Sequence, residues 1–251
     1  MTDLSGRVAL VTGAARGVGQ AVAIALSAAG ADCVLLAREA GSLEQTTRRM
    51  ARSPHTILGV DLCDGEALEA AMAALCATAP PDIFVHCAAP MFTYEKIHAA
   101  SAQVLDTQLQ VNARAAFQVA QHLLPEMMLR RWGRVVLMGS LSARRGDRGA
   151  AAYSMSKAAL GSLARSITLE YARYQVTANT LVLGPIDGER LRARDAESPG
   201  ARQRALQHAP ARRLPTPEQV AGIVTFLCSP PAAAINGASI DVSCGIHLQA
   251  R

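Results

Sequence analysis

Tyr153 and Lys157 are the two side chains of this sequence whose types and spacing most clearly predict chemistry. They stand four positions apart, and because an i, i+4 pair lies on one face of a helix, the phenol and the ammonium can share one pocket. A phenol has a pKa of about 10, and a neighbouring cation favours its ionised form. The pair therefore predicts a general acid, Tyr153, that Lys157 tunes to exchange a proton with a carbonyl or alcohol oxygen.

The scarcity of lysine makes this pair informative. Of the 25 basic residues only Lys96 and Lys157 are lysines, and the 251 residues include 4 tyrosines. Composition alone predicts about 0.03 Tyr–Lys pairs at this spacing. Arginine stays protonated and presents a rigid fork, so lysine suits the tuning role better.

A glycine-rich segment, residues 12–19, follows the first short apolar run, residues 8–12, and precedes a stretch of helical period. Gly13, Gly17 and Gly19 would let the backbone turn sharply and approach a pyrophosphate, whose charge meets the free N–H groups at the start of the helix. Glycines are common in turns, but this position between a strand and a helix predicts a dinucleotide site.

The end of the second apolar run predicts which dinucleotide binds. An enzyme that uses NAD needs an acidic group there for the ribose 2′-OH, and that carboxylate would repel a 2′-phosphate. The corresponding residue is Ala37, followed by Arg38, and Arg16 lies in the glycine-rich segment. Two guanidinium groups suit a phosphate, so we expect NADPH/NADP+ rather than NADH. The alternative is two solvated arginines in an arginine-rich chain.

Short apolar runs alternate with segments of helical period along the whole chain, which is typical of repeated βαβ units. We expect a single α/β domain over residues 1–251, a Rossmann-type doubly wound parallel sheet with helices on both faces. Residues 185–215 are polar and arginine-rich and interrupt the alternation, so we interpret them as a mobile lid over the site, or alternatively as a solvated surface loop with a helix. The predicted strands are residues 8–12, 33–37, 56–60, 83–87, 134–139, 176–182 and 238–242; the predicted helices are residues 19–29, 43–51, 65–78, 102–129 and 151–174, and a last one capped by Thr216, Pro217 and Gln219.

Composition narrows the function classes. Half of the residues are hydrophobic and 18% are charged, as in a globular protein, and every apolar run is too short to span a membrane. Residues 1–7 lack the pattern of a secretory leader, so we expect a cytoplasmic protein. The 6 cysteines form no C-x-x-C pair, which predicts no metal site, and the net charge of +5 comes without aromatic residues interleaved with the basic ones, which argues against nucleic-acid binding.

The spacing G-x-x-x-G-x-G resembles the short-chain dehydrogenase/reductase family, and the resemblance extends from residue 8 to residue 245. It implies that Ser140, thirteen residues before Tyr153, holds the substrate oxygen against Tyr153, and that Asn112 positions a water beside Lys157 for proton relay. These four residues are the catalytic set that the resemblance implies. Its cofactor-binding set consists of Gly13, Arg16, Gly17, Val18, Gly19, Arg38, Asp61, Leu62, Ala88, Tyr153, Lys157 and Ile186.

Two segments depart from the family pattern. The sequence His-Cys-Ala-Ala at residues 86–89 stands where the family usually has Asn-Asn-Ala-Gly, so the loop near the nicotinamide ribose is altered. Gly188 stands where a threonine that contacts the carboxamide often lies. Ile186 can still offer its backbone, and a consequence would be weaker anchoring of the nicotinamide.

The resemblance implies reduction of a keto group to a secondary alcohol, and the chain looks most like β-ketoacyl-ACP reductases. Arg131 and Arg173 resemble positions that dock an acidic acyl carrier, or are solvated arginines at helix ends. The remaining arginines near the expected substrate site hint at an anionic substrate or carrier; they are Arg144, Arg145, Arg148, Arg190, Arg192 and Arg194. The alternatives are an NADP-dependent secondary-alcohol dehydrogenase and a non-catalytic NADPH-binding protein. We expect a homotetramer or homodimer formed through the helices at residues 102–129 and 151–174.

Overall fold

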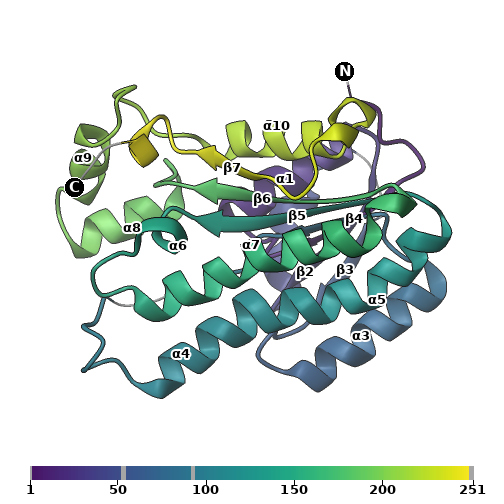
Figure 1. Ribbon diagram of the computed structural model, residues 1–251, viewed down its shortest axis with the longest axis horizontal. Helices are drawn as coiled ribbons and strands as arrows, with labels where there is room; N and C mark the ends of the chain where they lie inside the picture. Colours follow the sequence, from purple (N-terminus) through teal and green to yellow (C-terminus); the bar gives the residue numbers. More distant parts are fainter. Residues whose placement is uncertain (1, 52–54, 92–93, 249–251) are drawn as a thin grey trace.

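One parallel sheet forms the centre of the molecule, as the sequence predicted. The computed structural model describes residues 2–51, 55–91 and 94–248, and within them the sheet has seven strands in the order β3-β2-β1-β4-β5-β6-β7 (Figure 1). All neighbouring strands pair in parallel. The strands are β1 (Val8–Thr12), β2 (Asp32–Ala37), β3 (Thr56–Gly59), β4 (Ile83–His86), β5 (Gly133–Ser140), β6 (Val176–Leu183) and β7 (Ser239–Val242).

Helices cover both faces of this sheet and give the fold three layers (Figure 1). On one face lie α1 (Gly17–Ala28) and α10 (Pro217–Leu227), and on the other lie α3 (Gly65–Thr78), α4 (Ala102–Leu109), α5 (Ala115–Leu129) and α7 (Ala151–Tyr171). Each face has its own apolar core, centred on residues such as Val22 and Val224 on the first face and Leu123 and Leu160 on the second. Because both faces are covered, every residue of β5 is buried.

Local sequence signals explain where several elements begin and end. Thr216 caps α10, accepting a hydrogen bond from the Gln219 N–H, while the Gln219 side chain accepts one from the Thr216 N–H. Asp64 caps α3 without such a reciprocal bond, since its side chain accepts from the N–H groups of Glu66 and Ala67 in the first turn. The predicted helix at 43–51 is wrong in extent, because the structure has a 3₁₀ turn (Ala40–Leu43) followed by the short α2 (Glu44–Thr47).

The predicted long helix at 102–129 is continuous but not uniform. Between α4 and α5 the chain forms one π-helical turn, Gln110–Arg114, which contains Asn112. A π turn inserts an extra residue into the helical repeat and so rotates the side chains that it carries; such turns are frequent at functional sites. The predicted helix at 151–174 ends as α7 at Tyr171 and is followed by a 3₁₀ turn, Ala172–Tyr174.

The segment 185–215 contains two helices, α8 (Glu189–Glu197) and α9 (Ala201–Gln207). Leu191 and Leu214 of this segment are buried in a third, smaller apolar cluster together with Leu141 and Val182, which lie at the carboxyl ends of β5 and β6. The segment therefore covers that end of the sheet; that it acts as a mobile lid stays a prediction, and we keep the name lid for residues 185–215. None of the helices in the described ranges is both long enough and apolar enough to cross a membrane.

Candidate active site

The predicted site residues gather at one edge of the sheet, where the carboxyl ends of the strands meet. Thr12, the last residue of β1, pairs with His86, the last residue of β4. The strand order reverses between these two strands, and ligands of open α/β sheets bind at such a switch point. Ser140 ends β5 at the same edge and pairs with Leu183 of β6.

The glycines of the segment between β1 and α1 meet steric needs that other residues cannot meet. A Cβ on Gly13 would lie 2.8 Å from the Ala88 Cα, and a Cβ on Gly19 would lie 2.1 Å from the Gly13 carbonyl oxygen. Gly13 and Gly17 have φ of 68° and 57°, which favours glycine. The N-cap residue of α1, Arg16, makes no side-chain cap, so the first N–H groups of this helix can bind an anion.

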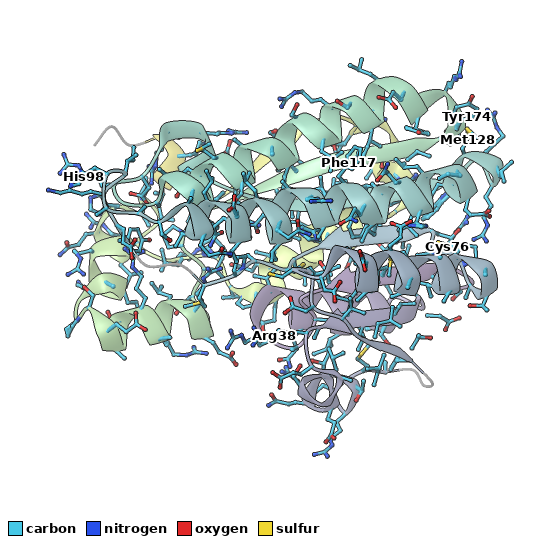
Figure 2. The ribbon with its side chains drawn as sticks, turned by 90° about the horizontal axis from the view of Figure 1, so that it is seen from below. Arg38, Cys76, His98, Phe117, Met128 and Tyr174 are labelled. Carbon is cyan, nitrogen blue, oxygen red and sulfur yellow. The ribbon has the colours of Figure 1, made fainter. Side chains whose placement is uncertain are left out.

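The residues predicted to recognise the adenosine end lie on the surface beside this loop. Arg16, Arg38 and Asp61 are exposed, whereas Leu62 is buried. The Arg38 Nε lies 3.9 Å from a Glu39 carboxylate oxygen, and both side chains are about three-quarters exposed, at 74% and 77%. Figure 2 shows Arg38 at the surface of the amino-terminal half. A weak, solvated ion pair of this kind leaves the guanidinium group able to bind a phosphate.

Lys157 is buried beneath the surface of the site. Its exposed fraction is 3%, and within the described residues it forms no salt bridge with a carboxylate. Burial, reinforced by the positive charge of Arg190 and weakly opposed by Cys87, lowers the pKa of Lys157 to about 7. Tyr153, one helical turn earlier on α7, is only partly buried, so its ring remains accessible to a substrate.

Asn112 reaches this helix through a hydrogen-bonded connection that the sequence did not reveal. The Asn112 Nδ2 donates to the Ser156 Oγ at 3.0 Å, and the Ser156 Oγ donates to the Tyr153 carbonyl oxygen at 2.8 Å. A second bond from the Asn112 Nδ2 goes to the Gln108 Oε1 at 2.9 Å. Ser156 lies between the predicted acid and Lys157, and it fixes the π turn against the start of α7.

One acceptor and one donor in the site remain available to a bound group. The Asn112 Oδ1 is buried and accepts no hydrogen bond from any described residue. The Ser140 Oγ accepts from the Ser142 N–H at 3.2 Å, which leaves its own O–H able to donate. Ser140 is 7% exposed, so a substrate oxygen that it binds would be shielded from most of the solvent.

His86, one of the departures from the family pattern, is a fully buried neutral side chain. Its Nδ1 lies 2.9 Å from the Thr12 Oγ1, and the two groups share one hydrogen bond. Burial and the nearby charge of Lys157 lower the pKa of His86 to about 3, and contacts with the backbone of Val111 and Asn112 oppose this only in part. The same Thr12 Oγ1 accepts from the Ala88 N–H at 3.3 Å, so the Thr12 hydroxyl connects the end of β1 to both His86 and Ala88.

The structure corrects the interpretation of several arginines. Arg144 donates to the Asp241 carboxylate at 2.6 Å and to the Ser239 carbonyl oxygen at 2.8 Å, so it ties α6 (Ser142–Arg145) to β7 and is not directed at a substrate. Arg145 donates to the carbonyl oxygen of Ile246 at 3.4 Å.

Arg131 and Arg173 lie at the opposite edge of the sheet from the site. They precede β5 and β6, and the Arg131 Nη2 donates to the Arg173 carbonyl oxygen at 3.2 Å. Ser140 is at the far end of β5, about 23 Å away at the rise of a strand. Within one subunit, these two arginines do not contribute to the site.

Fold and site together define a class of protein: an oxidoreductase with a doubly wound sheet that binds its dinucleotide at the switch point. Residues 13–247 match the family described as enoyl-(acyl carrier protein) reductase. The chain belongs to the short-chain dehydrogenase/reductase family, as the sequence motifs predicted.

Individual relatives match over nearly the whole chain. The 3-oxoacyl-[acyl-carrier-protein] reductase MabA of Mycobacterium tuberculosis is 34% identical over 244 residues, covering 96% of this chain and 93% of that protein. Dehydrogenase/reductase SDR family member 4 of Oryctolagus cuniculus is 31% identical, with 96% and 94% covered. Among solved structures, a 3-oxoacyl (acyl-carrier-protein) reductase of Agrobacterium tumefaciens with NADP bound has a TM-score of 0.89 and 33% identity, with 96% and 95% covered.

Proposed function

We propose that this enzyme uses NADPH to reduce a keto group to a secondary alcohol. The observation that carries the proposal is the position of Lys157, buried one turn from Tyr153 beside the loop after β4, where nothing in the fold itself requires a buried ammonium. Buried charges without a partner are costly and are typical of functional sites.

Each polar side chain of the site would have one role in transferring a proton to the substrate oxygen. NADPH supplies a hydride when it is bound. The Ser140 O–H would hold the carbonyl oxygen of the substrate, and Tyr153 would donate its phenolic proton to that oxygen as negative charge develops on it. The ammonium form of Lys157 would stabilise the resulting phenolate, and Asn112 would hold a water from which the proton is replaced.

Several features of the chain suit NADPH. Gly13, Gly17 and Gly19 make room for a pyrophosphate at the start of α1, while Val18 and Ala88 line the loop. Arg16 and Arg38 offer two exposed guanidinium groups for a 2′-phosphate. Asp61 and Leu62 would contact the adenine, and the Ile186 backbone the nicotinamide. The Agrobacterium relative binds NADP, which supports the same assignment here.

The names of the relatives, 3-oxoacyl-[acyl-carrier-protein] reductases, support a β-keto compound bound to a carrier as the substrate. The alternative substrate is another anionic β-keto compound. Cellular NADP is kept mostly reduced, which favours reduction of a ketone over oxidation of an alcohol. A cytoplasmic location is part of the same proposal.

We propose that a second copy of this chain covers the outer face of α4, α5 and α7. Phe117 is 50% exposed and Leu169 is 87% exposed on this face, which Figure 2 views with Phe117 labelled. A groove there is lined by apolar side chains that include Leu109, Ala113 and Leu163. Exposed apolar surface of this kind is typical of an interface between subunits. Sedimentation of the wild type and of Phe117→Glu would test the proposed dimer or tetramer, because the charge should shift the protein toward monomers.

Replacing Tyr153 with Phe tests the proposed chemistry. Loss of NADPH oxidation with a β-keto ester, followed by nicotinamide absorbance, is expected in Tyr153→Phe, while NADPH binding measured by fluorescence remains. Tyr171→Phe removes a hydroxyl from the same helix about 27 Å further along and should keep full activity. Turnover retained in Tyr153→Phe would overturn the proposed role.

A further inference from the structure

Arg190, the second residue of α8, extends from the lid toward the catalytic side chains. Its Nη2 donates to the carbonyl oxygen of Pro90 at 2.8 Å, so it connects the lid to the segment after β4. The guanidinium carbon lies 6.0 Å from the centre of the Tyr153 ring. Its charge also acts on the buried ammonium of Lys157. Arg190 thus lies beside the Tyr153 ring, and its charge acts on Lys157.

The lid helix fixes this direction. Leu191 is buried in the apolar cluster beneath the lid, which sets the rotation of α8 about its own axis. Arg194 lies one turn after Arg190 on the same helical face, and its guanidinium carbon is 4.4 Å from the centre of the Tyr94 ring. Arg192 projects from a different face of α8, although all three arginines, Arg190, Arg192 and Arg194, are exposed. Arg190 and Arg194 are therefore the arginines of this helix whose guanidinium groups lie over tyrosine rings, those of Tyr153 and Tyr94.

The charges at this point of the site favour an anion. The positive charge of Arg190, whose guanidinium carbon lies 6.0 Å from the centre of the Tyr153 ring, lowers the pKa of Lys157. Within the described part of the chain no carboxylate forms a salt bridge with Lys157. A negative group held between them would be attracted by both, and a carboxylate matches the planar fork of a guanidinium group with two hydrogen bonds.

We propose that Arg190 is a specificity-determining residue that binds a carboxylate close to the keto group of the substrate. The enzyme would then prefer a free short-chain 3-oxo acid to its neutral ester or thioester. This inference rests on the proposed keto reduction and narrows it. It also differs from what the relatives' names describe, because a 3-oxoacyl group bound to a carrier has no carboxylate at that end.

A matched pair of substrates and a matched pair of variants test the inference. Acetoacetate and ethyl acetoacetate differ in charge but share the reacting ketone, so the ratio of their kcat/KM values isolates recognition of the carboxylate. In Arg190→Met this ratio should fall by about 10-fold to 100-fold, as expected for loss of a charge-assisted hydrogen bond. Arg192→Met removes the same charge from the same helix and should leave the ratio unchanged. An equal ratio in wild type and Arg190→Met, or an equal fall in both variants, would overturn the inference.

Binding of malonate to the NADP+-loaded protein, measured by calorimetry, separates the inference from the proposed function. Malonate carries the carboxylate but no keto group, so its affinity is independent of turnover. Binding that weakens in Arg190→Met and persists in Arg192→Met supports the inference even if no keto compound is reduced, in which case the proposed function fails. The inference is refuted if malonate does not bind, or if it binds equally well to the wild type and to Arg190→Met. If ethyl acetoacetate is reduced in that case, the proposed function still stands.

Discussion

Replacing Lys157 with Met should stabilise the ligand-free protein while abolishing its activity. The pKa of Lys157 falls from its ordinary value of 10.5 to about 7 in the fold, chiefly through burial. A difference of this size corresponds to about 5 kcal/mol between the unfolded and folded states of the charged side chain. Methionine has a similar length and no charge, so Lys157→Met removes that cost and keeps most of the packing.

The effect has a defined pH dependence. Below about pH 7 Lys157 is protonated in both states, and the full cost of burying the charge is present. Between about pH 7 and 10.5 the unfolded chain binds the proton and the folded chain does not, so the stability of the wild type rises with pH. The advantage of Lys157→Met should be about 5 kcal/mol at pH 6 and should shrink by about 1.4 kcal/mol for each pH unit in that window.

Urea unfolding followed by circular dichroism at pH 6, 8 and 10 measures this difference, with protein concentration held fixed because assembly would also stabilise the fold. The other lysine provides the control. Lys96 is exposed, so Lys96→Met should change stability by less than about 0.5 kcal/mol at every pH. A wild type as stable as Lys157→Met at pH 6, or a difference that stays constant up to pH 10, would refute the argument from burial.

Three other substitutions test the loop, the cofactor preference and the buried histidine. Gly19→Ala places a Cβ 2.1 Å from a carbonyl oxygen of its own loop, so NADPH affinity by fluorescence titration should fall at least about 10-fold, whereas Gly222→Ala, which has nothing within 4 Å, should not change it. Ala37→Asp should shift the ratio of kcat/KM for the two cofactors toward NADH, and an unchanged ratio would contradict the assignment. His86→Leu deprives the Thr12 hydroxyl of its buried partner and should cost about 1–3 kcal/mol in urea unfolding, while an unaltered midpoint would mean that this bond contributes nothing.

The fold was predictable because the signals that begin and end its helices are local in the sequence. The cap at Thr216, the cap at Asp64 and the glycines after residue 12 mark boundaries that depend only on neighbouring residues. The predicted helix at 43–51 had no such marks and rested on a few apolar residues. In the structure only Leu43 and Thr46 of this region are buried, so packing does not extend the helix beyond Thr47.

The geometry of the candidate site could be predicted where its residues are close in sequence, but not where they lie on separate elements; the catalytic roles of these residues stay predictions. Tyr153 and Lys157 follow from helical spacing, whereas the contact between Asn112 and Ser156 joins two different helices. The π turn around Asn112 likewise has no sequence signal, since it results from how the helix packs. His86 was recognisable as a departure, but only the pairing of β1 with β4 gives it a partner.

The electrostatics of the site imply that its ligands and its stability are coupled. Of the groups next to Lys157, His86 stays neutral because its pKa is about 3, and the Cys87 thiol stays neutral because burial raises its pKa to about 12. Arg190 adds a second positive charge. Within the described residues no salt bridge balances the buried ammonium, so a bound anion would supply negative charge there. A ligand that raises the pKa of Lys157 must, by linkage, bind more tightly when Lys157 is protonated, so its affinity should fall as pH rises above about 7. The same buried charge that weakens the empty fold should thus strengthen the binding of anions, and a bound anion would keep Lys157 in the ammonium form that the proposed mechanism requires.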